Sequence, residues 1–182
     1  MLANHEMGKS MQEDKYDALF WANEQGYVDM DNVCISGASY GGYAAMQAAT
    51  KNPEIFKCII AYVGVYDLTS SDLRGLQWSE LSQPMEYIEK GNPRDPEDYK
   101  NLYENSPLFF AENVEDPVLI ITGRRDSQVR FQETVDMVNE LKKYGKEHKY
   151  MIKGDEGHGF RTETARLELF EDYEKFLAEY LN

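Results

Sequence analysis

Short apolar runs rich in β-branched residues alternate along this chain with longer stretches of helical period. Four of these runs are predicted strands: 33–36, 57–63, 118–122 and 148–152, each bounded by Gly, Pro, Asn or Asp. Their near-continuous apolarity is typical of a parallel sheet that is covered on both faces. The alternation therefore predicts an α/β fold with a mostly parallel sheet and helices on both of its faces.

Three stretches carry apolar side chains at helical spacing, and we expect each to pack on the sheet. The residues that share a face are Tyr16, Leu19, Phe20 and Asn23 in the first stretch, Phe131, Val135, Val138 and Leu141 in the second, and Leu167, Phe170, Glu174, Leu177 and Leu181 in the third, with Tyr173, Phe176 and Tyr180 beside that stripe. Residues 69–113 break the pattern with four prolines. We expect this segment to be an irregular helical excursion within a single domain, residues 1–182.

A nucleophile elbow is predicted directly after the first strand. The segment Gly37-Ala38-Ser39-Tyr40-Gly41-Gly42 has the G-x-S-x-G pattern, and a helix-forming run, 43–49, follows it. A sharp strand-to-helix turn strains the nucleophile's backbone, and glycine neighbours let strand and helix approach closely. We expect Ser39 to be the nucleophile and the N–H of Tyr40 to face the developing oxyanion. The alternative is a glycine-rich connection without chemistry; the lysine of a phosphate-binding loop is absent.

An acid and a base follow the later predicted strands. A serine hydroxyl needs a base within hydrogen-bond reach, and that imidazole needs an acceptor on its other nitrogen. Asp126 follows the strand at 118–122, and His158 lies in a glycine-flanked loop after the strand at 148–152. Because ligands of α/β sheets bind at the carboxyl ends of the strands, both side chains are predicted to meet Ser39 there.

Other residues compete for these two roles to different degrees. The remaining histidines, His5 and His148, lie near the terminus and at the start of a strand, so neither has a comparable setting. Three acids remain alternatives or supports for Asp126. Asp155 and Glu156 share the loop of His158, and we expect them to solvate it or to cap the next helix. Asp67 follows another strand run.

Three motifs resemble the catalytic domain of the prolyl oligopeptidase family, which includes dipeptidyl peptidases and acylaminoacyl peptidases. They are Gly37-Ala38-Ser39-Tyr40-Gly41-Gly42-Tyr43, Gly123-x-x-Asp126-x-x-Val129 and Glu156-Gly157-His158-Gly159-Phe160. The resemblance covers nearly the whole chain. It implies an α/β-hydrolase domain, usually preceded by a β-propeller, and cleavage of short peptides through an acyl-enzyme, with no cofactor or metal.

The chain departs from that family in two places. Thr122-Gly123 stands where His-Gly is frequent and Arg130 where Pro is frequent, and neither change removes a catalytic atom. Only 38 residues precede Ser39, so we expect a truncated sheet, either of a fragment or of a minimal hydrolase. No HGGG-like run supplies a second oxyanion donor, whose loss costs roughly 100-fold to 1000-fold in rate. The uncovered strand edge predicts a homo-oligomer, most simply a dimer.

The amino-acid composition narrows the classes of molecule that this chain is expected to bind. The net charge of −14, from 33 acidic and 19 basic residues, disfavours nucleic acid and anionic membrane surfaces. No run approaches the about 20 apolar residues of a membrane span, and the N-terminus has no signal-peptide core, so a cytoplasmic location is favoured for the chain as given. Cys34 and Cys58 both lie in apolar runs, where we expect free buried thiols.

These observations predict a serine hydrolase that cleaves peptide or ester bonds in small substrates. One alternative is a carboxylesterase acting on small esters, because the same triad serves both reactions. Another, of a different class, is a non-catalytic fragment or assembly module of a larger hydrolase. Candidate pocket residues are Tyr40, Tyr66, Trp78 and Tyr87, although aromatic residues in an irregular segment are more often packing than pocket.

Overall fold

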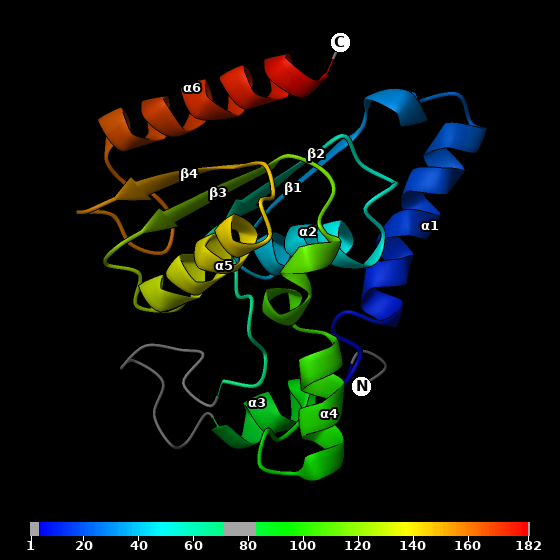
Figure 1. The fold of residues 1–182 in the computed structure, drawn as a ribbon, viewed down its shortest axis with the longest axis vertical. Coiled ribbons are helices and arrows are strands. Elements are labelled where there is room, and N and C mark those ends of the chain that lie inside the picture. Colours follow the sequence, from blue (N-terminus) through cyan, green and yellow to red (C-terminus); the bar gives the residue numbers. More distant parts are fainter. Residues whose placement is uncertain (1–3, 71–82, 182) are drawn as a thin grey trace.

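A four-stranded parallel sheet forms the centre of the protein (Figure 1). The computed structural model describes residues 4–70 and 83–181. The strands lie in sequence order and all pair in parallel: β1 (Cys34–Ala38), β2 (Cys58–Tyr62), β3 (Val118–Gly123) and β4 (His148–Lys153). All four predicted strands are confirmed, with ends that differ by one or two residues. The parallel arrangement brings the four carboxyl ends to one edge of the sheet.

Helices cover both faces of this sheet, as predicted. The helices of the described residues are α1 (Ser10–Glu24), α2 (Tyr40–Lys51), α3 (Gln83–Lys90), α4 (Pro96–Glu104), α5 (Phe131–Lys143) and α6 (Glu163–Tyr180), with the short 3-10 helices η1 (Met30–Asn32) and η2 (Pro107–Asn113). Figure 1 shows α6 on one face of the sheet and α2 and α5 on the other. The predicted excursion contains α3, α4 and η2. Within the described part of the chain, no helix is both long and apolar enough to cross a bilayer.

Side chains of successive strand residues enter two separate cores, because neighbours along a strand point to opposite faces. In β2 and β3, Ile59 and Ile120 join the core beneath α2 and α5. Their neighbours Ile60 and Ile121 join the core beneath α6. Each of these four side chains is 0% exposed. Burial on both faces explains why the strand runs are apolar throughout rather than alternating.

The predicted contact stripe of α6 is wrong in part. Leu167 and Phe170 are 58% and 66% exposed, whereas the sheet-facing core takes Phe176, with Tyr173 and Tyr180 packed against it. The predicted stripe contained Glu174, whose carboxylate would have had to be buried against the sheet. The helix is instead turned toward its aromatic side, which buries more apolar area and leaves Glu174 exposed.

The other two predicted helix faces are confirmed in their inner parts. Tyr16 is buried and Leu19 packs on the main core, but Phe20 is 45% exposed. On α5, Val138 and Leu141 are buried in that core.

A disulfide joins Cys34 to Cys58, and the expectation of two free thiols is therefore wrong. The two residues are direct register partners on β1 and β2, with Cα atoms 4.7 Å apart. This separation lies within the range that a disulfide spans. The apolar runs identified both strands but not the register between them, which is what places the two sulfur atoms together.

Candidate active site

Ser39 occupies the turn between β1 and α2 in a strained backbone conformation. Its φ is 57° and its ψ −119°, in the positive-φ region that non-glycine residues rarely adopt. A Cβ on Gly37 would overlap the carbonyl group of Gly41, and one on Gly42 would lie 2.7 Å from the carbonyl oxygen of Tyr62. Glycine at these two positions therefore permits the close approach of strand and helix that raises Ser39 above the sheet edge.

Three side chains from three loops form a hydrogen-bonded chain at this edge. Nε2 of His158 lies 2.9 Å from Oγ of Ser39, and Nδ1 of His158 lies 2.8 Å from Oδ2 of Asp126. The side chains of His158 and Asp126 are 15% and 0% exposed. These loops leave the carboxyl ends of β1, β3 and β4, so the parallel sheet brings together residues that are 119 and 32 positions apart in the sequence.

Asp126 is held by its own loop as well as by the histidine. Its Oδ1 accepts the backbone N–H groups of Gln128 and Val129, each at 2.8 Å. One carboxylate oxygen thus orders the loop while the other faces the imidazole. The loop is in turn fixed to the loop of His158, because the N–H of Arg125 donates to the carbonyl of Glu156 at 2.9 Å.

The competing acids have other partners. Glu156 accepts the N–H groups of Arg161 and Thr162 at the start of α6 and the Thr162 hydroxyl, and these bonds lower the pKa of its carboxyl. Asp155 pairs with Arg125 at 2.7 Å in an exposed position. Asp67 accepts the N–H and hydroxyl of Thr69. The structure therefore places only Asp126, among these four acids, against the imidazole of His158.

The pocket candidates are dispersed. Tyr40 is the first residue of α2, so its N–H lies at the helix N-terminus beside Ser39, where no intrahelical acceptor exists. Tyr66 is 0% exposed and belongs to the main core, which corrects its assignment to an open pocket. Tyr87 lies half-buried on α3, and Trp78 lies outside the described residues.

Sequence reasoning missed the contribution of Tyr62. Its carbonyl oxygen accepts the N–H of Ser39 at 2.9 Å, and its hydroxyl accepts the N–H of Phe160, two residues beyond His158. As part of an apolar strand run, Tyr62 carried no signal that distinguished it from core residues. No group of three His, Cys, Asp or Glu side chains that could hold a metal ion occurs in residues 4–70 and 83–181.

The chain is similar to known serine peptidases along its length. The profile of the prolyl oligopeptidase family matches residues 2–182. The chain belongs to this family. It is 32% identical over 180 residues to dipeptidyl peptidase family member 6 of Caenorhabditis elegans, and 33% identical over 179 residues to dipeptidyl aminopeptidase BIII of Pseudoxanthomonas mexicana. Each match covers 98% of the chain but only 24% and 26% of the relative, so the chain spans about a quarter of their length.

Solved structures place the chain in the α/β-hydrolase fold. An acylaminoacyl peptidase in complex with Z-Gly-Gly-Phe-chloromethyl ketone superposes with a TM-score of 0.84 at 26% identity, over 98% of this chain and 29% of that one. A puromycin-hydrolyzing peptidase of Mycobacterium tuberculosis superposes with a TM-score of 0.89 at 24% identity, over 99% and 26%. The chain is thus a hydrolase-fold domain of a serine peptidase family, as the sequence motifs predicted.

Proposed function

We propose that this chain is a serine hydrolase that cleaves peptide or ester bonds through an acyl-enzyme on Ser39. The observation that carries the proposal is the hydrogen-bonded chain from Ser39 through His158 to the buried Asp126. A serine hydroxyl is a weak nucleophile until a base removes its proton, and the imidazole acts well only when one tautomer is held. Asp126 supplies that acceptor.

In the proposed reaction, Nε2 of His158 takes the proton of the Ser39 hydroxyl as Oγ bonds to the substrate carbonyl carbon. The carbonyl oxygen becomes an oxyanion, which the N–H of Tyr40 and the positive end of α2 stabilise. His158 then donates its proton to the leaving amine or alcohol as the carbon–heteroatom bond breaks. Water, deprotonated by the same imidazole, attacks the acyl-enzyme, and the proton returns to Ser39 as the acid is released.

The leaving group separates the peptidase from the esterase form of this proposal. Dipeptidyl and acylaminoacyl peptidases are among the similar proteins, which supports short peptides as the substrates of this chain. Tyr40 is the single oxyanion donor that the elbow supplies, which favours activated esters, since an alcohol leaves more readily than an amine. We therefore expect ester hydrolysis to exceed hydrolysis of the matching amide, and a small-ester carboxylesterase is the second candidate.

Fluorophosphonate labelling followed by mass spectrometry tests the proposal. We expect one adduct on Ser39, none in Ser39→Ala, and turnover of p-nitrophenyl esters that Ser39→Ala lacks. A dipeptide amide series with the same acyl groups then separates peptidase from esterase. A folded wild-type chain that neither reacts with the phosphonate nor hydrolyses esters would contradict the proposal and favour a non-catalytic assembly module.

A further inference from the structure

A segment that begins at the last residue of β2, residues 62–70, touches two of the three loops of the proposed triad. Its first residue, Tyr62, accepts the N–H of Ser39 through its carbonyl and the N–H of Phe160 through its hydroxyl. A displacement of this segment would therefore shift the nucleophile's backbone and the loop that carries His158.

The next residue holds strain. Val63 has a φ of 45°, a left-handed conformation that is unfavourable for a β-branched side chain. Such a conformation is strained and persists only where the surroundings hold the chain on both sides. On one side, the N–H of Val63 donates to the carbonyl of Ile121 on β3 at 2.7 Å. The turn needs a second anchor further along the segment.

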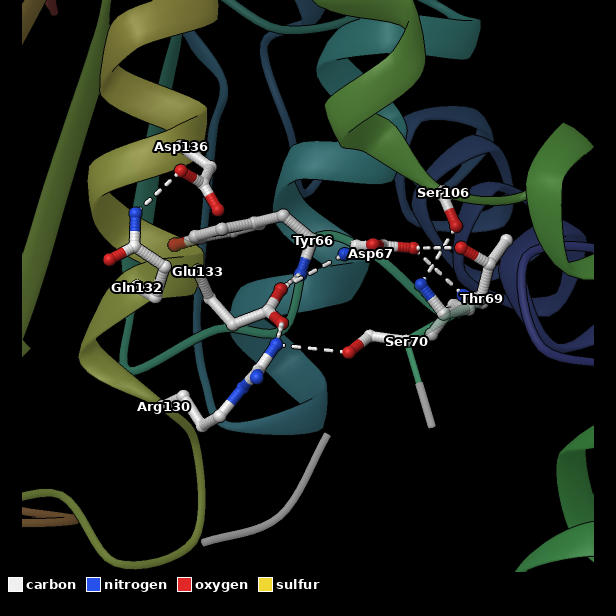
Figure 2. A network of polar contacts seen from close by, with 10 residues as sticks. Tyr66, Asp67, Thr69, Ser70, Ser106, Arg130, Gln132, Glu133 and Asp136 are labelled. Carbon is white, nitrogen blue, oxygen red and sulfur yellow. Dashed lines mark hydrogen bonds and ion pairs between the residues drawn. The ribbon is translucent and has the colours of Figure 1, made fainter. Parts of the chain in front are cut away.

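Glu133 supplies this second anchor from the first turns of α5 (Figure 2). Its Oε2 accepts the backbone N–H groups of Tyr66 and Asp67, each at 3.0 Å. The carboxylate lies seven positions after Asp126, so one short stretch of chain bears both the proposed catalytic acid and the anchor of the Ser39-side segment. Further along, the N–H of Leu68 donates to Oγ of Ser106 at 2.8 Å.

The environment of Glu133 is unusual for a carboxylate near a helix start. Its side chain is only 3% exposed, and burial raises the pKa of its carboxyl, while the two backbone N–H groups and Arg130 act in the opposite direction. The Arg130 guanidinium lies 3.8 Å from Oε1 and also donates to the Ser70 hydroxyl at 2.9 Å. A carboxylate at the surface is solvated by water and needs no such partners. A buried carboxylate is stable only when groups such as these main-chain N–H donors and the Arg130 guanidinium replace that water.

We propose that Glu133 is a positioning residue, which holds the strained turn at Val63 and thereby the backbone of Ser39 in register with His158. The inference rests on the proposed function. According to this proposal, the position of the segment depends on the length of the Glu133 side chain, because both hydrogen bonds end on the single oxygen Oε2. Glu133→Asp keeps the charge but withdraws the carboxylate by one methylene, whereas Glu133→Gln keeps the reach and an accepting oxygen without the charge.

The experiment compares these two variants with Asp136→Asn, one turn further along α5, whose Oδ1 bonds the Gln132 side chain rather than the segment. Amide hydrogen exchange is measured over residues 62–70, and ester hydrolysis is normalised to the sites that react with fluorophosphonate. In Glu133→Asp we expect faster exchange at Tyr66 and Asp67 and a fall in kcat of at least about tenfold with KM within about threefold, because misplacing a reacting group by about 1 Å can cost 100-fold. Glu133→Gln is expected to keep kcat within about threefold of wild type, and Asp136→Asn to match wild type.

Each result bears on a separate step. Unchanged exchange in Glu133→Asp would overturn the anchor. Faster exchange with unchanged kcat per reactive site would overturn the positioning role and leave Glu133 a purely structural residue. A kcat as low in Glu133→Gln as in Glu133→Asp would overturn the dependence on reach. A folded wild-type chain without phosphonate reactivity would overturn the proposed function and the positioning role with it, while the exchange data would still report the anchor.

Discussion

Nδ1 of His158 lies 2.8 Å from Oδ2 of Asp126, and the Asp126 side chain is 0% exposed. Asn in place of Asp126 can present its amide N–H to Nδ1 of His158, so the tautomer that the carboxylate holds is no longer enforced. We predict that Asp126→Asn lowers kcat for ester hydrolysis by about 10,000-fold, as expected when a triad acid becomes an amide. Steady-state kinetics with a p-nitrophenyl ester measure the change.

Asp155→Asn is the matched control, because Asp155 is in the His158 loop but pairs with Arg125 at an exposed position. Its kcat should stay within about threefold of wild type, in line with the small value of surface ion pairs. A loss of activity in Asp155→Asn with a fully active Asp126→Asn would reverse the assignment of the acid.

The Cys34–Cys58 disulfide predicts the thiol content of the purified protein. The denatured chain should contain no titratable thiol before reduction and two afterwards. Because the two cysteines are 24 positions apart, the disulfide is expected to stabilise the fold by about 3 kcal/mol through its restriction of the unfolded chain. Urea unfolding of the Cys34→Ala/Cys58→Ala protein measures this loss. Two free thiols in a sample kept from reductants would contradict the pairing.

Asp116 predicts a pH dependence of stability. Burial raises the pKa of its carboxyl to about 6, Glu115 and Glu54 add to this, and its Oδ2 is buried with no hydrogen-bond partner among the described residues. The pKa of Asp116 in the folded protein lies above the ordinary value of 3.8. Its contribution to the free energy of unfolding is therefore fully present below about pH 4 and is lost as the pH rises through 6. The group is half-exposed, so solvent screening reduces the effect to about 1 kcal/mol.

The test is urea unfolding at pH 4 and pH 7. Asp116→Asn should be more stable than wild type by about 1 kcal/mol at pH 7 and equal to it near pH 4. The exposed Asp17→Asn serves as the control and should show neither change. A variant whose stability follows the wild-type pH profile would exclude Asp116 as the titrating group.

The edge of β1 predicts self-association. Within the described residues β1 pairs on one side only, with β2, and it exposes Ser36 and Ala38. Unpaired main-chain groups on such an edge invite another strand, so we propose a symmetric dimer through β1. Light scattering at micromolar concentration should give the mass of two chains, and Ser36→Lys, which places a charge on the edge, should reduce it to one. A monodisperse wild-type monomer would contradict the dimer.

Local sequence patterns were sufficient for the four strands, for the elbow and for the candidate residues of the site. The four strands, the elbow and the order of Ser39, Asp126 and His158 follow from apolar runs, glycine placement and loop position, because each depends on residues close together in the chain. The parallel sheet then constrains the carboxyl ends of its strands to one edge, and this explains why three distant residues could be assigned to one site.

Tertiary packing decided the features that depend on the register between strands and on the rotation of helices about their axes. The pairing of β1 with β2 joined Cys34 to Cys58, and the turning of α6 toward its aromatic side exposed Leu167 and Phe170. The role of Glu133 is of the same kind, since an acidic residue in the first turns of a helix is usually solvated, and only the fold brings the N–H groups of Tyr66 and Asp67 to it. The sequence by itself determined the fold class and the residues of the proposed triad through local pattern, whereas the disulfide, the buried face of α6 and the Glu133 anchor depend on which distant surfaces meet, a choice made by the packing free energy of the whole chain.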